Sequence, residues 1–259
     1  MEAGGKEMHF NCFGEKSNPH ILLIHGVLTP WQIWMPQIEY FQKKYYVIVP
    51  ALDGHEAGKQ SKFISIEEEA KKMEGYCSEH TGTDLLAVCG LSMGGAIAHL
   101  LWKKSVLKIQ NLILDGASLV PYGRFMKSVM TKQYLDIVRK SKERAPKTLE
   151  SFKKVFLPEK YLKDYLAFID YLDEESMANM ILSMSSSSLI INDISLETRI
   201  LYLHGTKMNE MLSRKSAEQI GKAYPNTKVI RFDGCSHCEK VIYAPAQWID
   251  LIEGFLNRE

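Results

Sequence analysis

The sequence predicts an α/β protein with a doubly wound, mostly parallel sheet and an inserted helical cap. Apolar runs of strand length alternate with amphipathic helical stretches in the first half of the chain, which is typical of a parallel sheet with crossover helices. This alternation stops after residue 117 and resumes near residue 199, and between them apolar residues recur only at helical spacing. We therefore expect a sheet domain made of residues 1–117 and 199–259, and a helical cap made of residues 118–198.

The first half contains the signals of five strands. An edge strand is expected at residues 8–13, followed by the apolar run HILLI at 20–24, which is typical of a parallel strand buried on both faces. An amphipathic helix at 32–43 then leads to a strand at 45–49. We expect Pro50 to end that strand, because proline lacks the N–H that a sheet needs.

A capping box predicts the start of the next helix. Ser65 is followed three residues later by Glu68, and this spacing indicates a helix at 66–80. The remaining expected elements follow in chain order: strands at 85–89 and 112–114 on either side of a helix at 96–104, then, after the cap, a strand at 200–203, a helix at 213–224, a strand at 228–232 and a helix at 245–256.

Composition limits the possible partners. Among 259 residues, 32 basic side chains are balanced by 31 acidic ones, so the chain has no basic excess that would bind a nucleic acid. No apolar run approaches the ~20 residues that span a bilayer, and none near the N-terminus resembles a signal peptide. We expect a cytoplasmic protein that binds a small molecule and contacts neither nucleic acid nor membrane; its oligomeric state cannot be predicted.

The cysteines predict neither disulfides nor a metal. Their number, five, is odd, and Cys89 lies in an expected buried strand, which suits reduced thiols. Cys235 and Cys238 form a CxxC pair around His237, but zinc requires four ligands and no second pair exists. We interpret them as ordinary thiols, and we expect no metal and no cofactor.

The stretch GLSMGG at residues 90–95 is the most informative motif. An apolar strand runs into it and a small-residue helix runs out of it, which is the context of a serine nucleophile on a tight strand-to-helix turn. The turn lifts Ser92 above the sheet and directs a helix N-terminus at the developing oxyanion. Gly90 and Gly94 are then explained by the lack of space for side chains beside the turn.

The chain as a whole resembles the α/β-hydrolase fold superfamily, in the branch of esterase-like enzymes with a helical cap. The motifs that carry the resemblance span the chain: His25-Gly26, Asp53-Gly54-His55, the turn at 90–95, His204-Gly205 and the late His237.

The resemblance implies roles for individual residues. Ser92 would be the nucleophile and His237 the base that takes its proton. The backbone N–H groups of Val27 and Met93 would form the oxyanion hole. His25 is expected to brace its loop, and the Asp53-Gly54-His55 turn is expected to be structural.

The triad acid is where the chain departs from the family pattern. The superfamily usually has an aspartate three residues after the glycine that ends the penultimate strand, and Met208 occupies that position. Glu210, on the same loop, and Asp115, at the end of the strand after the nucleophile helix, are the two substitutes. Asn209 would be a neutral acceptor and would stabilise an imidazolium less. The sequence leaves the choice between Asp115 and Glu210 open.

The cap is rich in aromatic and methionine side chains, some of which are expected to roof an apolar pocket over Ser92. We therefore expect a carboxylesterase that cleaves esters of small or medium apolar acyl groups through an acyl-enzyme on Ser92. The same apparatus serves a thioesterase, a lactonase, a carbon–carbon bond hydrolase or an aminopeptidase. A ligand-binding module with little or no catalysis is the alternative that Met208 suggests.

Overall fold

The computed structural model describes residues 8–58, 61–189 and 197–257. Its centre is a seven-stranded sheet in the order β1-β3-β2-β4-β5-β6-β7, with β1 antiparallel to β3 and the other neighbouring pairs parallel. The predicted fold class is therefore confirmed. The strands are β1 (His9–Phe13), β2 (His20–Ile24), β3 (Tyr46–Ala51), β4 (Asp84–Leu91), β5 (Lys108–Asp115), β6 (Arg199–Gly205) and β7 (Lys228–Phe232).

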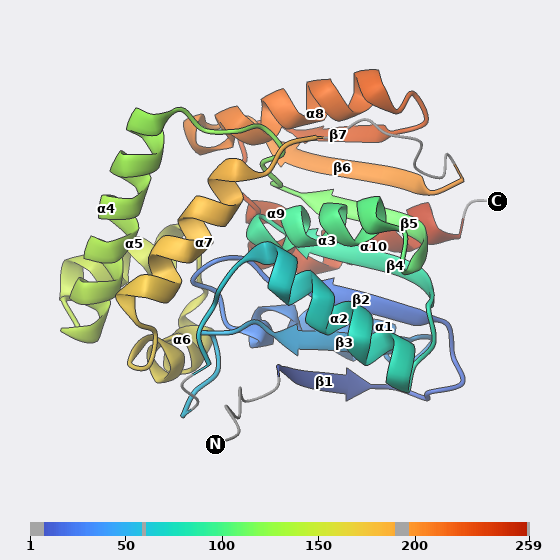
Figure 1. Ribbon diagram of the computed structural model, residues 1–259, viewed down its shortest axis with the longest axis horizontal. Coiled ribbons are helices and arrows are strands. Elements are labelled where there is room, and N and C mark those ends of the chain that lie inside the picture. Colours follow the sequence, from blue (N-terminus) through green and yellow to red (C-terminus); the bar gives the residue numbers. More distant parts are fainter. Residues whose placement is uncertain (1–7, 59–60, 190–196, 258–259) are drawn as a thin grey trace.

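Helices cover both faces of the sheet (Figure 1). One face carries α2 (Ile66–His80), α3 (Met93–Lys104) and α8 (Met211–Ala223), and α3 packs directly on β4 and β5. The other face carries α1 (Met35–Phe41) and α10 (Pro245–Leu256), which contact each other. Short helices precede three of these: η1 (Trp31–Trp34), η3 (Met208–Glu210) and α9 (Glu239–Tyr243).

Most predicted elements of the sheet domain are confirmed within a few residues, but the expected effect of Pro50 is wrong. Pro50 lies inside β3, opposite Phe10 of the edge strand β1. Its other neighbour, β2, pairs with β3 only as far as Ile48, so Pro50 lies beyond the part of β3 that has partners on both sides. A proline is tolerated there because little of the ladder depends on its missing N–H.

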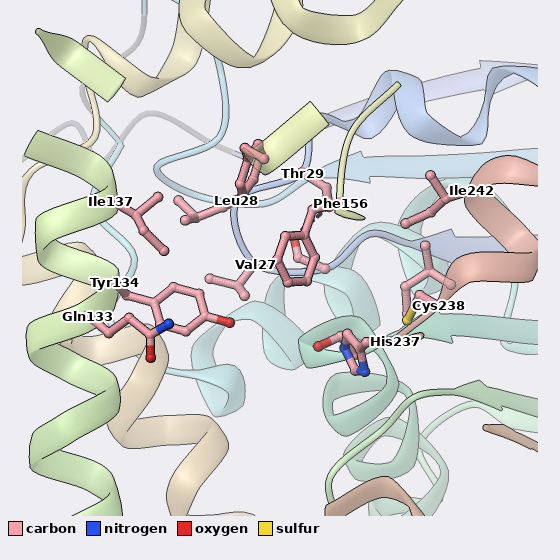
Figure 2. Close-up of a pocket in the computed structure, with 14 residues that line it drawn as sticks. Val27, Leu28, Thr29, Gln133, Tyr134, Ile137, Phe156, His237, Cys238 and Ile242 are labelled. Carbon is pink, nitrogen blue, oxygen red and sulfur yellow. Dashed lines mark hydrogen bonds between the residues drawn. The ribbon is translucent and has the colours of Figure 1, made fainter. Parts of the chain in front are cut away.

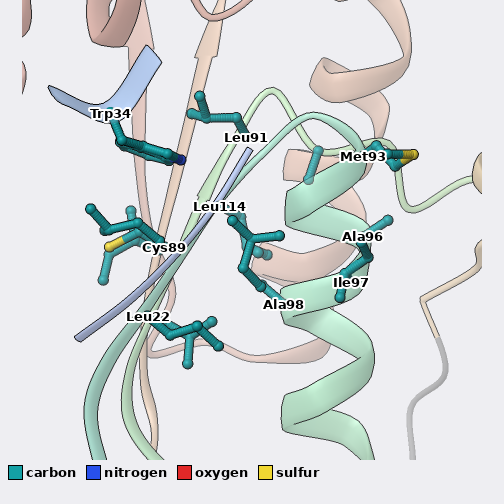
Figure 3. Packing of buried hydrophobic residues seen from close by; sticks show 14 of the residues in the cluster. Leu22, Trp34, Cys89, Leu91, Met93, Ala96, Ile97, Ala98 and Leu114 are labelled. Atoms are coloured by element: carbon teal, nitrogen blue, oxygen red, sulfur yellow. The ribbon is translucent and has the colours of Figure 1, made fainter. Parts of the chain in front are cut away.

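The core on both sides of β4 fixes the turn that contains Ser92. Leu22 and Leu114 point from the sheet toward α3, whereas Cys89 and Leu91 point to the opposite face, where Trp34 covers them (Figure 3). These five side chains are at most 2% exposed. Because β4 and α3 are both packed against a rigid core, the turn that joins them has little freedom to move.

Between β5 and β6, the described residues form four α-helices: α4 (Arg124–Lys142), α5 (Pro146–Val155), α6 (Leu162–Ile169) and α7 (Glu174–Ser186), with a short η2 (Glu159–Tyr161) before α6. Figure 1 shows them at the end of the sheet toward which the parallel strands point. The last part of the predicted cap, residues 190–196, lies outside the described residues. Among the described helices, none has both the length and the apolar character that crossing a membrane requires.

Candidate active site

Ser92 occupies the whole turn between β4 and α3. Its backbone has φ 50° and ψ −111°, a conformation that non-glycine residues rarely adopt. The turn is held by the Ser92 N–H, which donates to the carbonyl of Asp115 at 2.8 Å, and by the Ser92 carbonyl, which accepts from the N–H of Gly95 at 3.0 Å. The elbow that the motif predicts is therefore present, with its serine at the N-terminus of α3.

The glycines of the motif are explained by contacts with backbone atoms. A methyl group on Gly90 would lie 2.3 Å from the carbonyl oxygen of Gly94, and one on Gly94 would lie 2.3 Å from that of Ile24. No side chain fits in either place, since such distances are far below van der Waals contact. The two glycines let α3 begin directly against β2 and β4.

His237 and Glu210 form a hydrogen-bonded pair. Nδ1 of His237 lies 3.1 Å from Oε1 of Glu210, which also accepts from the N–H of Cys238 at 3.3 Å. The Glu210 side chain is fully buried, and the imidazole is 19% exposed. Because a carboxylate only accepts, Nδ1 of His237 carries the proton and Nε2 has a free lone pair.

The pair shifts the pKa of both partners. Burial alone would raise the pKa of Glu210, but the hydrogen bond with His237 and the charge of His237 hold it below its usual value. Burial alone would lower the pKa of His237, but the hydrogen bond and charge of Glu210, with the charge of Asp115, raise it above 6.5. Glu210 is therefore ionised at neutral pH and stabilises an imidazolium at His237.

The loop after β6 explains why Glu210, and not residue 208, reaches the imidazole. The N–H groups of Thr206 and Lys207 donate to the carbonyl of Cys235 at 3.0 and 3.1 Å, which fastens this loop to the turn before His237. The loop then continues into η3, whose last residue, Glu210, points inward, while Met208 is 83% exposed. Asn209 donates from Nδ2 to Oγ of Ser236 at 2.7 Å instead of reaching the imidazole.

Asp115 is also buried at this end of the sheet, but its carboxylate has a different partner. Its Oδ2 accepts from Nε1 of Trp248 on α10 at 2.9 Å. Burial, together with the charge of Glu210, raises the pKa of Asp115 to about 7. Of the two acids that the sequence leaves open, the structure brings Glu210 to the imidazole and Asp115 to an indole.

The loop after β2 lies beside Ser92 and carries Val27. A methyl group on Gly26 would lie 3.4 Å from Cβ of Ser92, so the Gly26–Val27 peptide group is next to Ser92. Met93 is the first residue of α3, and its N–H is one of those that a helix N-terminus leaves unpaired. Of the two predicted oxyanion-hole residues, Val27 lines a pocket together with Ser92, and Met93 follows Ser92 directly in the chain.

Ser92 and His237 line the same two adjoining pockets. The first is mainly apolar, and Figure 2 shows Gln133, Tyr134 and Ile137 projecting into it from α4, across from His237. The second, larger pocket extends toward η3 and α8. Apart from His237, the described residues lining the two pockets include no ionisable acid or base of the Asp, Glu, Lys, Arg or His type.

Several residues that line the pockets could not be identified from the sequence. The aromatic and methionine side chains of the predicted cap include residues that line the pockets, but also core residues such as Phe168 and exposed ones such as Phe125. Spacing along α4 could have identified Ile137, one turn after Tyr134 on the same face. The residues of the predicted cap, 118–198, that line at least one pocket are Ser118, Tyr122, Met130, Gln133, Tyr134, Ile137, Phe152, Phe156 and Met184.

Gly116 is another residue of the site that the sequence does not point to. It has φ 65°, and a methyl group on it would lie 2.7 Å from Cε1 of His237 and 2.8 Å from Sγ of Cys238. The imidazole therefore lies directly against the backbone of the turn after β5. Only a glycine leaves that space free.

Comparison with known families places the chain in one of them. The family model described as alpha/beta hydrolase fold matches residues 19–149, which are half of the chain. The chain belongs to this family, which confirms the resemblance that its motifs carry, and it is classed as a hydrolase of the α/β-hydrolase fold.

The individual proteins that the chain resembles share less than 30% sequence identity with it. Over 99 residues the chain is 28% identical to 3-oxoadipate enol-lactonase 2 from Acinetobacter baylyi, a match that covers 34% of this chain and only about a third (33%) of that protein. An alpha/beta hydrolase family protein from Desulfitobacterium hafniense has a TM-score of 0.75 at 21% identity, covering 96% of this chain and 100% of the other. A thermophilic esterase from Thermogutta terrifontis has a TM-score of 0.72 at 20% identity, covering 96% and 92%. At these identities the two structures show the shared fold.

Proposed function

We propose that the protein is a serine carboxylesterase whose triad is Ser92, His237 and Glu210. The observation that carries the proposal is the 3.1 Å hydrogen bond between Nδ1 of His237 and Oε1 of Glu210, at an imidazole that lines both pockets with Ser92. This bond fixes the tautomer in which Nε2 can accept a proton. The buried carboxylate stabilises the imidazolium that results.

The reaction follows from these positions. Oγ of Ser92 attacks the ester carbonyl while Nε2 of His237 takes its proton, and the N–H groups of Val27 and Met93 donate to the resulting oxyanion. The tetrahedral intermediate collapses, the ester C–O bond breaks, and His237 gives its proton to the leaving alcohol. Water then attacks the acyl-enzyme in the same way, which releases the acid and restores Ser92.

The pocket linings favour a neutral substrate. Neither pocket presents a Lys or Arg side chain among its described lining residues, and Arg139 is occupied by Asp136 at 2.7 Å on the outer surface of α4. A carboxylate on the substrate would lose its hydration there without gaining a partner. We therefore propose esters of small or medium apolar acids, covered by helices of the inserted segment acting as a cap.

Two neighbouring functions deserve comparison. The enol-lactonase relative is named for 3-oxoadipate, a dicarboxylate, and the pockets described here offer no cation for such a molecule. A binding module without catalysis would not require a buried carboxylate aligned on an imidazole. In the sequence, Met208 at the usual position of the acid suggests that alternative. Met208 is exposed, however, and the buried Glu210 takes the role of acid in the proposed triad.

Hydrolysis of chromogenic esters tests the proposal. We expect the protein to cleave p-nitrophenyl butyrate and Ser92→Ala to lower kcat at least about 10³-fold, because the nucleophile is removed. The hemisuccinate ester, whose acyl group carries a carboxylate, should show a kcat/KM about 100-fold lower. Equal turnover by wild type and Ser92→Ala would disprove the proposed function, whereas a preference for the hemisuccinate would disprove only the neutral substrate class.

A further inference from the structure

Two buried histidines lie behind the loop that carries Val27, and the proposed mechanism gives them no task. His25 follows β2 directly and His55 lies on the loop after β3, and both are at most 2% exposed. Their rings meet edge to face, with centroids 4.9 Å apart. Two imidazoles in such contact cannot both be charged without strong repulsion.

The hydrogen bonds of His25 fix its protonation. Its Nδ1 lies 3.0 Å from the carbonyl oxygen of Gly26, and because a carbonyl only accepts, Nδ1 must carry the proton. Its Nε2 accepts from the N–H of Leu52 at 3.1 Å. His25 is therefore neutral, in the Nδ1–H tautomer, and burial lowers its pKa to about 4.

His55 makes the reciprocal arrangement. Its Nδ1 donates to the carbonyl of Asp53 at 3.2 Å, and its Nε2 accepts from the N–H of Leu28 at 3.2 Å. Burial, and then the neighbouring His25, hold the pKa of His55 well below 6.5. Each histidine thus belongs to one loop and accepts a hydrogen bond from a backbone N–H of the other. We call this pair of bonds, from Leu52 to His25 and from Leu28 to His55, the clasp between the two loops.

The clasp acts on the peptide group that contains the oxyanion donor. The carbonyl of Gly26 and the N–H of Val27 belong to one planar trans peptide, and they point in opposite directions. That carbonyl accepts two hydrogen bonds, from Nδ1 of His25 at 3.0 Å and from Oγ1 of Thr29 at 2.9 Å. With the oxygen held on one side, the N–H of Val27 is directed to the other.

The next residue shows why the loop needs support. Leu28 has φ 54°, which non-glycine residues seldom adopt, and its N–H is the group held by His55. Without that acceptor, the loop could relax toward a more common backbone conformation and rotate the neighbouring peptide. Two bonds on the Gly26 carbonyl also polarise the peptide and make its N–H a stronger donor.

We propose that His25, Thr29 and His55 are positioning residues that aim and hold the Val27 N–H at the oxyanion. The inference rests on the proposed function, since it assigns a task within the same reaction. None of the three side chains touches the reacting atoms in this role; each acts through the Gly26–Val27 peptide or the loop around it.

Thr29 offers the cleanest test, because Thr29→Val keeps the shape of the side chain and removes only the hydroxyl. We expect kcat on p-nitrophenyl butyrate to fall about tenfold with KM changed less than about twofold, since loss of a whole oxyanion donor costs about 10²–10³. Inhibition by phenylboronic acid, whose tetrahedral adduct on serine places an oxygen in the oxyanion hole, should weaken by a similar factor. Thr29→Ser, which restores the hydroxyl, should recover most of the lost kcat.

A nuclear magnetic resonance measurement on wild-type protein tests the clasp without using activity. The ring nitrogens of His25 and His55 should show the neutral Nδ1–H tautomer from about pH 8 down to about pH 5. Titration of either ring near 6.5, or a Thr29→Val enzyme with the kcat and boronate inhibition of wild type, would overturn the inference. The proposed function fails separately, through an inactive wild-type protein or an active Ser92→Ala variant.

Discussion

Glu210 is the residue on which the proposed mechanism depends most, and the family pattern does not predict its position. The sequence shows Met208 where an aspartate is usual, and it leaves Glu210 and Asp115 as equal candidates. The choice depends on which carboxylate lies within hydrogen-bonding distance of Nδ1 of His237, and that is set by the bonds that fasten residues 206–210 to the turn before the histidine. Such contacts between distant segments have no local signature.

Substitution of the two acids should therefore have very unequal effects. We expect Glu210→Gln to lower kcat by about 10³–10⁴-fold, because an amide no longer favours the productive tautomer or stabilises the imidazolium. Asp115→Asn should change kcat less than about fivefold, since the amide oxygen still accepts from Nε1 of Trp248. Steady-state kinetics on p-nitrophenyl butyrate measures both, with thermal unfolding as the control for folding. A severe loss in Asp115→Asn and a mild one in Glu210→Gln would reverse the assignment of the acid.

The same pair predicts how the rate depends on pH. His237 must be neutral to take the serine proton, and its pKa is raised above 6.5 although burial opposes the shift. We expect kcat/KM to rise about tenfold per pH unit on the acid side, with a midpoint above 6.5, and then to level off. Glu210→Gln removes the group that raises the pKa of His237 most, while burial still lowers that pKa, so the midpoint should move to lower pH. Profiles of the two proteins between about pH 5 and pH 9 provide the measurement, and an unshifted midpoint would show that Glu210 does not act on His237.

Among the structural elements, the turns after the strands decide where the side chains of the proposed triad lie. Periodicity predicts the bodies of the elements well: β2, α2, β7 and α10 have the predicted limits, because their burial patterns are regular. Periodicity does not predict the carboxyl ends of the strands, where β4 ends two residues and β5 one residue later than expected. Those extra residues include Asp115, whose carbonyl holds the N–H of Ser92.

The turn after β5 can be tested through Gly116. We expect Gly116→Ala to lower kcat at least about tenfold, because the new methyl group occupies space 2.7 Å from Cε1 of His237 and displaces the imidazole. Gly75→Ala is the matched control, because Gly75 lies exposed within α2 with no neighbour in its way. That variant should keep wild-type kcat and gain about 0.5–1 kcal/mol of stability. A Gly116→Ala enzyme as active as Gly75→Ala would contradict the position of the imidazole.

For the molecule as a whole, the site depends on how the inserted helices pack over the sheet. The sequence predicts the sheet but not this packing. Open parallel sheets bind ligands at the carboxyl ends of their strands, and residues that follow β2, β4, β5 and β6 line the two adjoining pockets. The inserted segment is different, because nothing in the sequence shows that Phe152 of α5 and Phe156, the residue after α5, line a pocket. Packing of one helical layer on another decides this, and many arrangements share the same periodicity.

Chemical labelling tests most directly whether Ser92, His237 and Glu210, from three separate segments, form one catalytic unit. A fluorophosphonate reacts only with a serine that a base has activated, and mass spectrometry of the digested protein locates the adduct. We predict one adduct on Ser92 in the wild-type protein, none in Ser92→Ala, and labelling slowed by orders of magnitude in His237→Ala and Glu210→Gln. An unlabelled wild-type protein, or an adduct on another residue, would contradict the proposed active site.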